Sequence, residues 1–163
     1  MTGKSARKIL FTSAAAVLLI MAAGMDAAAQ PSGPGGEVKI TVYVIEASEG
    51  VPGVDPQIRH IVKQFHGTFR HSTYKLVSKV PRKISMGEET RIALPGLREL
   101  RIKALGYETG RIKLKLRISK KSTRGRSHDV LNTEFRLIKG GTIVIGDYNY
   151  HEGKLILAIS ANM

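Results

Sequence analysis

Cysteine and tryptophan are both absent from this chain of 163 residues. The lack of cysteine excludes disulfide bridges, thiolate metal sites and a lipid attached through an N-terminal cysteine. Other aromatic residues are scarce, and none lies between residues 108 and 134. Single-stranded nucleic acid is normally bound by aromatic rings that stack on bases between cations. The composition therefore makes nucleic acid an unlikely partner.

The first 29 residues have the pattern of a signal peptide. Cations at residues 4–8 precede the apolar run Ile9–Met21, and a small-residue cleavage motif follows at residues 27–29. The apolar run is shorter than the roughly 20 residues of a membrane span. We predict cleavage between Ala29 and Gln30 and a periplasmic or secreted protein without a transmembrane span. An uncleaved N-terminal anchor is the alternative.

Acidic residues are also few, with 13 Asp and Glu against 26 Lys and Arg, for a net charge of +13. Most of this excess lies outside the predicted leader. A strongly basic protein attracts anionic partners by long-range electrostatic steering. For an exported protein these partners are acidic envelope proteins, anionic lipids and saccharide phosphates.

Residues 30–36 are rich in Gly and Pro and predict a flexible lead-in, and residues 37–163 have the length of a single domain. The segment 38–48 is apolar on both sides, which is typical of a central strand. After residue 72 the apolar residues alternate with polar ones in successive short segments, which predicts antiparallel strands. We predict an α+β domain of mostly antiparallel β-structure, with about nine strands and one amphipathic helix after the first strand.

The predicted helix covers residues 55–67. Asp55 is a favourable N-cap, and Pro56 stands at the first helical position, where a missing N–H is harmless. One apolar stripe then predicts packing on a sheet; its members are Ile58, Ile61, Val62 and Phe65.

Breaker residues predict the ends of the later strands. Pro81 is expected to end the strand that begins near residue 73. Turns are expected near Gly87, at Pro95–Gly96 and at 106–110, and the pair Gly140–Gly141 is expected to close another hairpin.

The segment RIKLKLRISKKSTRGR, residues 111–126, alternates cations with apolar residues and then continues into a basic loop. Residues two apart in a strand share a face, so the first four cations form one row. The candidate anion-binding surface comprises Arg111, Lys113, Lys115, Arg117, Lys120, Lys121, Arg124 and Arg126. Arg101 and Lys103, on the preceding strand, are expected on the same side. The competing interpretation is a solvated sheet face on which cations merely prevent aggregation.

The sequence offers little catalytic or metal-binding chemistry. Ser127, His128 and Asp129 are triad residue types, but they are consecutive and predict a strand that follows a loop. His60 and His66 lie about 240° apart around a helix and cannot share a metal. The polar segment 147–152 predicts a hairpin tip, with a small recognition loop as the alternative. We therefore predict a non-enzymatic protein without cofactors or metal sites.

Two segments resemble a known family. ITVYVIEAS, Ile40–Ser48, is similar to the strand that opens the core of secretin-type outer-membrane secretion proteins. LNTEFRLIKGGTIVIGDYNYHEGKLILAIS, Leu131–Ser160, resembles their late β-hairpins. The chain is much shorter than a pore-forming subunit, so the resemblance implies a small exported relative, accessory to a secretion or envelope assembly.

Two functional hypotheses follow from the sequence. The first is a periplasmic interaction domain that binds an anionic partner through the basic strand and loop. The second is a structural or accessory component of an envelope or secretion assembly, in which the charge is incidental. Either hypothesis is compatible with an oligomer.

Overall fold

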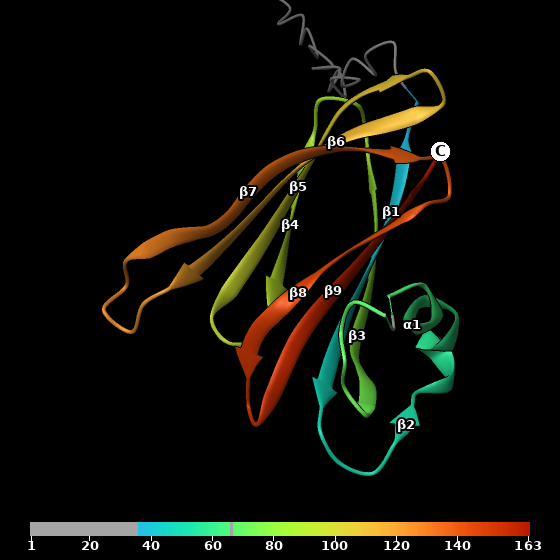
Figure 1. The fold of residues 1–163 in the computed structure, drawn as a ribbon. Coiled ribbons are helices and arrows are strands. Elements are labelled where there is room, and N and C mark those ends of the chain that lie inside the picture. Colours follow the sequence, from blue (N-terminus) through green and yellow to red (C-terminus); the bar gives the residue numbers. More distant parts are fainter. Residues whose placement is uncertain (1–35, 66) are drawn as a thin grey trace, which may run out of the picture. The chain divides into compact units, whose positions relative to one another are not determined.

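The computed structural model describes residues 36–65 and 67–163 and pairs the strands into two sheets (Figure 1). The predicted signal peptide, its cleavage site and all of the lead-in except Gly36 lie outside the described residues. The elements in chain order are β1 (Val38–Ser48), β2 (Gly53–Val54), the 3-10 turn η1 (Pro56–Ile58), α1 (Arg59–Phe65), β3 (Thr73–Ile84), β4 (Glu89–Leu94), β5 (Arg98–Glu108), β6 (Arg111–Lys121), β7 (Ser127–Ile138), β8 (Thr142–Tyr150) and β9 (Gly153–Asn162).

The predicted fold class is confirmed. The described residues form nine strands and one short α-helix, and every strand pair except β2–β3 is antiparallel. Sheet A has the strand order β2-β3-β1-β9-β8, and sheet B has the order β4-β5-β6-β7. As predicted, the first strand is central, because β1 lies between β3 and β9.

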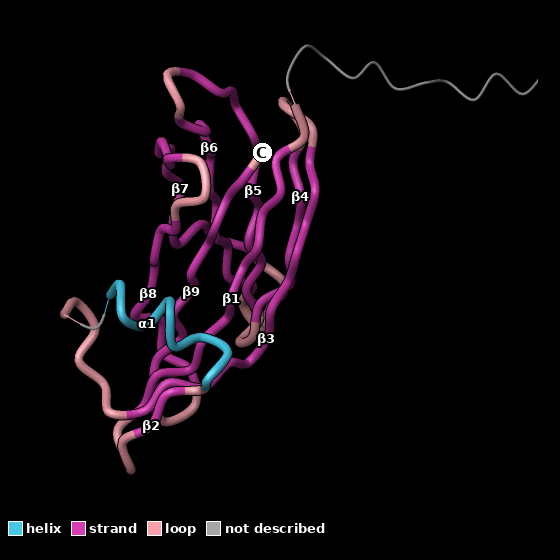
Figure 2. Tube along the Cα trace, turned by 90° about the vertical axis from the view of Figure 1, so that its right-hand side faces the viewer, coloured by secondary structure: helices cyan, strands magenta, loops and turns pink. Residues whose placement is uncertain are grey.

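The main core lies between the two sheets. Apolar side chains of β1 and β9 in sheet A meet those of β5 and β6 in sheet B. Figure 2 gives the same strands as a tube, turned by 90° from Figure 1. In β6 the buried members are Ile112, Leu114, Leu116 and Ile118, all with 0% exposure. Removal of such apolar side chains from water is the main force that holds a sandwich together. Because successive side chains of a strand point to opposite faces, the alternate residues of β6 face outward.

A second core lies on the other side of sheet A, under the helix. Asp55 caps the helical segment, and its Oδ1 accepts a hydrogen bond of 2.9 Å from the Gln57 backbone N–H. The predicted stripe is buried against the sheet, where it meets Tyr43 and Ile45 of β1. This packing explains why β1 is apolar on both sides, since each face contacts a different core.

Pro81 does not end a strand, contrary to the prediction. β3 continues to Ile84, and Pro81 pairs with Thr41 of β1. The short β2 pairs only with Thr73 and Tyr74, so the rest of β3 is an edge. A proline is tolerated there because its missing N–H faces away from the neighbouring strand.

The prediction of a hairpin closed by Gly140–Gly141 is also wrong. The turn exists, and the Gly141 N–H donates to Ile138 O at 2.8 Å. The strands on its two sides belong to different sheets, however, because β7 pairs with β6 and β8 pairs with β9. The turn therefore crosses from sheet B to sheet A.

Candidate anion-binding face

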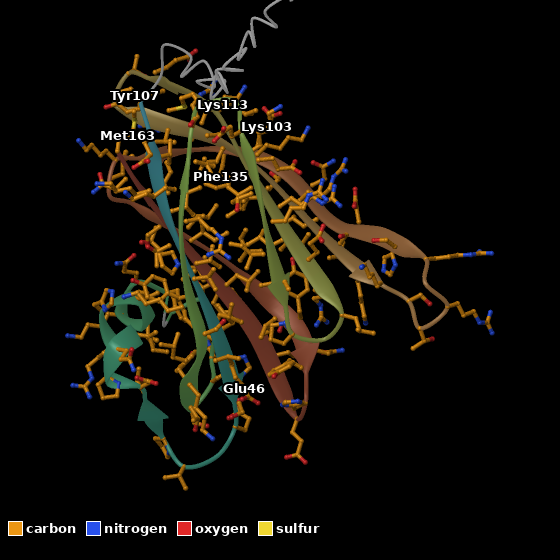
Figure 3. All side chains as sticks on the ribbon, turned by 180° about the vertical axis from the view of Figure 1, so that it is seen from behind. Glu46, Lys103, Tyr107, Lys113, Phe135 and Met163 are labelled. Atoms are coloured by element: carbon orange, nitrogen blue, oxygen red, sulfur yellow. The ribbon has the colours of Figure 1, made fainter. Side chains whose placement is uncertain are left out.

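The outer face of sheet B carries the predicted row of cations. Arg111, Lys113, Lys115 and Arg117 alternate along β6 with the buried core residues, so their side chains share the solvent side. Figure 3 shows Lys113 and Lys103 with their side chains, which come from the neighbouring strands β6 and β5. We call this surface, formed by the outward side chains of β4 to β7, the basic face.

The basic loop that follows the row of cations is shorter than the sequence suggested. Lys120 and Lys121 belong to β6, where they pair with His128 and Ser127 of β7. The Lys121 N–H donates to Leu97 O at 2.8 Å, which holds this end of the strand. Arg124 and Arg126 alone stand in the tight turn at the end of the β6–β7 hairpin, and both are exposed.

β5 brings two further cations beside the row, as the sequence suggested. In the β5–β6 register, Arg101 lies opposite Arg117, and Lys103 lies opposite Lys115. Like charges directly opposite each other in a sheet are destabilising by a few tenths of a kcal/mol. The centre of the basic face therefore concentrates positive charge in two adjacent cross-strand pairs.

The acidic partners of these cations were not foreseen. The Lys113 Nζ lies 3.1 Å from Glu134 Oε2, and the Lys115 Nζ lies 3.9 Å from Glu134 Oε1. Arg117 Nε lies 3.3 Å from Asp129 Oδ2. If the segments 111–121 and 127–138 are paired as a hairpin about the intervening loop, these acids lie opposite the row. That pairing could have been used to predict them from the sequence. Part of the row is thus neutralised within the chain.

Lys103 differs from its neighbours because no carboxylate of the described residues lies within ion-pair distance of its ammonium group. It is half-buried and lines a shallow hollow of about 300 Å³. The other residues that line the hollow are Glu89, Arg101, Leu105, Lys115, Arg117 and Glu134. Lys103 and Lys115 are therefore the two ammonium groups best placed to meet an anion in this hollow.

Glu99 forms the tightest ion pair on the basic face. Arg101 Nε donates a hydrogen bond of 2.6 Å to Glu99 Oε1, and this bond lowers the pKa of the carboxyl group. Partial burial opposes the shift, while Arg91 and Lys121 add to it. The same hydrogen bond raises the pKa of Arg101. Glu99 thus stays ionised and occupies Arg101, which leaves Lys103 as the less engaged cation of β5.

Ser127, His128 and Asp129 form the start of β7, and they do not assemble a triad. The Asp129 carboxylate pairs with Arg117, which turns it toward β6. All three residues are exposed. The arrangement is that of a solvated strand end beside the basic face.

The polar hairpin tip predicted at residues 147–152 is shorter in the structure, because residues 147–150 belong to β8 and only His151 and Glu152 form the turn before β9. The polar side chains of this segment have different neighbours: Asp147 pairs with Lys154 at 3.3 Å, and His151 lies 3.6 Å from Glu46. A hollow of about 550 Å³ beside the tip is lined by Glu46, Glu49, Lys75 and Glu152, among others. Within residues 36–65 and 67–163, no three His, Cys, Asp or Glu side chains are grouped to hold a metal ion. His66, of the predicted non-chelating pair, lies outside the described residues.

No family model matches the chain, and no curated protein or solved structure matches it significantly. The resemblance of Ile40–Ser48 and Leu131–Ser160 to secretins therefore stays a prediction. Of the helices in the described part of the chain, none has the length and apolar character that a bilayer crossing requires.

Proposed function

We propose that this protein is a non-enzymatic, exported interaction domain that binds an anionic partner through the basic face. The observation that carries the proposal is the register of β5 and β6, which places Arg101 opposite Arg117 and Lys103 opposite Lys115. A sheet whose outer side served only as a solvated surface would gain stability if opposite charges faced each other at these positions. An anion in the hollow between the strands would relieve this repulsion.

The partner is an acidic envelope protein, an anionic lipid or a saccharide phosphate. This assignment rests on the predicted signal peptide, since these are the anions that an exported protein meets. Near an anionic bilayer each Lys or Arg contributes about 1 kcal/mol. The ion pairs of Lys113, Lys115 and Arg117 reduce their share, so we expect binding that is weak and sensitive to salt.

The test uses vesicles of phosphatidylglycerol mixed with phosphatidylcholine, and the double variant Lys103→Glu, Lys115→Glu. We expect the wild type to co-sediment with the anionic vesicles at low salt and to be released at 1 M salt, where screening shortens to about 3 Å. The double variant should lose this binding. Vesicles of phosphatidylcholine alone are the control for binding that does not depend on charge.

A matched control is Arg59→Glu, Lys63→Glu on α1, because both residues are exposed and the change in net charge is identical. The control should bind nearly as well as the wild type, because α1 packs on the far side of sheet A. The milder variant Lys103→Gln, Lys115→Gln avoids placing a new carboxylate beside Glu134. Equal binding of the wild type and both Lys103, Lys115 variants would overturn the proposal.

A second candidate function is a structural or accessory component of an envelope or secretion assembly, with incidental charge. The pairing of Lys113 and Lys115 with Glu134 favours it, because these cations then have a purely internal explanation. The secretin resemblance points the same way. This candidate predicts a partner complex that persists at 1 M salt, which size-exclusion chromatography at low and high salt separates from the first proposal.

A further inference from the structure

The free side of β7 is the longest unprotected strand edge next to the basic face. β7 is the last strand of sheet B and pairs on one side with β6; a β-bulge at Val130 interrupts its 12 residues, so the regular part of the edge is the stretch 131–138. No strand of the described chain pairs with its other side. Edges of this length are normally shortened, bulged or blocked by proline, because their unpaired N–H and C=O groups can pair with another strand. The stretch 131–138 contains neither a proline nor a glycine.

Apolar side chains near this edge remain partly uncovered. Leu131 and Phe135 point to the core side and pack against the main cluster, yet both are only half-buried. Ile138, on the outer side, is 59% exposed. Figure 3 labels Phe135, whose backbone lies near the middle of the stretch 131–138. A strand placed along β7 would cover these side chains.

Two charged residues on this edge indicate which strand would pair with its free side. Glu134 and Arg136 are two residues apart on the outer side, and both are exposed. Arg136 lies opposite Lys113 in the β6–β7 register, and no carboxylate of the described residues lies within ion-pair distance of it. A carboxylate placed opposite Arg136 on the free side would give it an ionic partner. The strand itself carries one at the right spacing.

We propose that β7 pairs antiparallel with β7 of a second copy, about a two-fold axis that passes beside Phe135. Glu134 of each copy then lies opposite Arg136 of the other, and the two Phe135 rings meet on the core side. Thr133 lies opposite Leu137, and the paired stretch is Asn132–Ile138. Such an interface is self-complementary, as the two-fold symmetry of most homodimers requires.

The charges select this register over its neighbours. Opposed residues of an antiparallel pair share a face, so the axis must pass beside a single residue. An axis at Glu134 would bring the two Glu134 carboxylates together, and an axis at Arg136 would do the same with the two guanidinium groups. An axis at Phe135 instead forms two opposite-charge pairs and places the basic faces of both copies side by side.

The first test measures the mass of protein expressed as the full chain, by sedimentation over a wide range of concentrations at low salt. We expect the wild type to form a dimer, and Glu134→Arg to be monomeric because two Arg side chains would then oppose each other. The charge swap Glu134→Arg, Arg136→Glu should restore the dimer. A wild type that stays monomeric throughout, or a dimer that survives Glu134→Arg unchanged, would overturn the proposal.

The second test uses the absence of cysteine, which makes any introduced thiol unique. Residues at the axis oppose themselves, so Phe135→Cys should form an intermolecular disulfide on mild oxidation; disulfides need a Cα separation of about 4.4 to 6.8 Å. The matched control Asn132→Cys lies three residues from the axis, which separates the two copies of residue 132 by roughly 20 Å along the strands. Cross-linking of both variants at equal rates would indicate random collision and contradict the register. The charge-swap test leaves Phe135 intact and does not depend on how well Phe135→Cys folds.

The two proposals can fail independently. Loss of the dimer in Glu134→Arg with retained vesicle binding would separate the interface from the basic face. A dimer that does not bind anionic vesicles would support the interface and overturn the proposed function.

Discussion

Arg98 at the start of β5 in sheet B donates a hydrogen bond from Nη2 to the backbone oxygen of Asn149 in β8 of sheet A, at 3.0 Å. The side chain is 8% exposed, and its guanidinium lies 5.5 Å from the centre of the Tyr148 ring. Nη1 also donates to Pro95 O at 3.3 Å. This arginine thus connects the two sheets through a backbone carbonyl and an aromatic ring.

Replacement of Arg98 should therefore weaken the sandwich. We expect Arg98→Ala to lower the free energy of unfolding by about 2 to 3 kcal/mol, because hydrogen bonds from a charged donor and the packing on Tyr148 are lost. Arg98→Met should be less harmful, since the buried Nε has no hydrogen-bond partner and its desolvation is removed as well. Denaturant unfolding measures both. Arg91→Ala, at an exposed arginine of β4, is the control and should change stability little.

Tyr148 should make the protein less stable at high pH. Burial raises the pKa of its hydroxyl group, and the nearby Arg98 opposes the shift. The folded-state pKa therefore lies above the unfolded value of about 10. The stability that this difference provides is complete below pH 10 and is lost as the pH rises through the folded-state pKa. We expect Tyr148→Phe to flatten this alkaline decline, as followed by unfolding curves at increasing pH.

The control for Tyr148 is Tyr107→Phe, because Tyr107 is 45% exposed and lies at the far end of β5. This variant should keep the alkaline decline of the wild type. An identical decline in all three proteins would mean that Tyr148 does not carry the effect.

Glu99 should make the protein less stable at low pH. Its pKa is lowered, first by the hydrogen bond from Arg101, so the folded-state value lies below the unfolded value near 4.3. The stabilisation is present above that value and is lost as the pH falls through the folded-state pKa. Glu99→Gln should therefore be slightly less stable than the wild type at neutral pH, and the two should converge in acid.

Unfolding at neutral pH and at a series of acidic values would follow this convergence. Glu108→Gln, at an exposed carboxylate of the same strand, should run parallel to the wild type. The difference between wild type and Glu99→Gln should also shrink in high salt, because the pair is partly exposed. A constant difference at all pH values would contradict the assignment.

Gly153 is expected to tolerate no side chain. A Cβ at this position would overlap the backbone oxygen of Ala47 in β1 and approach the Ser48 Cβ. β9 pairs with β1 directly beside it, so the backbone has little freedom to move away. We expect Gly153→Ala to lower the free energy of unfolding by about 1 to 3 kcal/mol, the range for overpacking. Gly106→Ala is the matched control, because an added Cβ there meets no atom within 4 Å. Equal stability of both variants would show that β9 can shift.

Local patterns were sufficient for most elements of this fold. Asp55 and Pro56 marked the start of the helical segment, and the apolar stripe that includes Ile61 marked its buried face. Alternation along residues 111–118 assigned each side chain of β6 to a side, because a pleated strand leaves only two choices. Pro81 misled this reasoning because its effect depends on whether the strand has a neighbour on that side.

The candidate site was predictable only in part for the same reason. The row of cations on β6 is a local property, whereas Glu134 and Asp129 belong to a strand that meets the row only after the chain has turned. A β-bulge between Ile118 and Ser119 then shifts the register by one residue, which no short motif announces. The surroundings of Lys103 are likewise a product of register, which places it between Glu89 of β4 and Lys115 of β6.

The sequence by itself determined the strands, the helix, the two sides of each strand and the excess of positive charge. Only the tertiary structure decided that the strands divide into two sheets, that the turn at Gly140–Gly141 crosses between them, and that β7 is left with a free edge. The physical reason is that side-chain alternation depends on adjacent residues alone. Sheet membership instead depends on which distant apolar faces can be buried against each other.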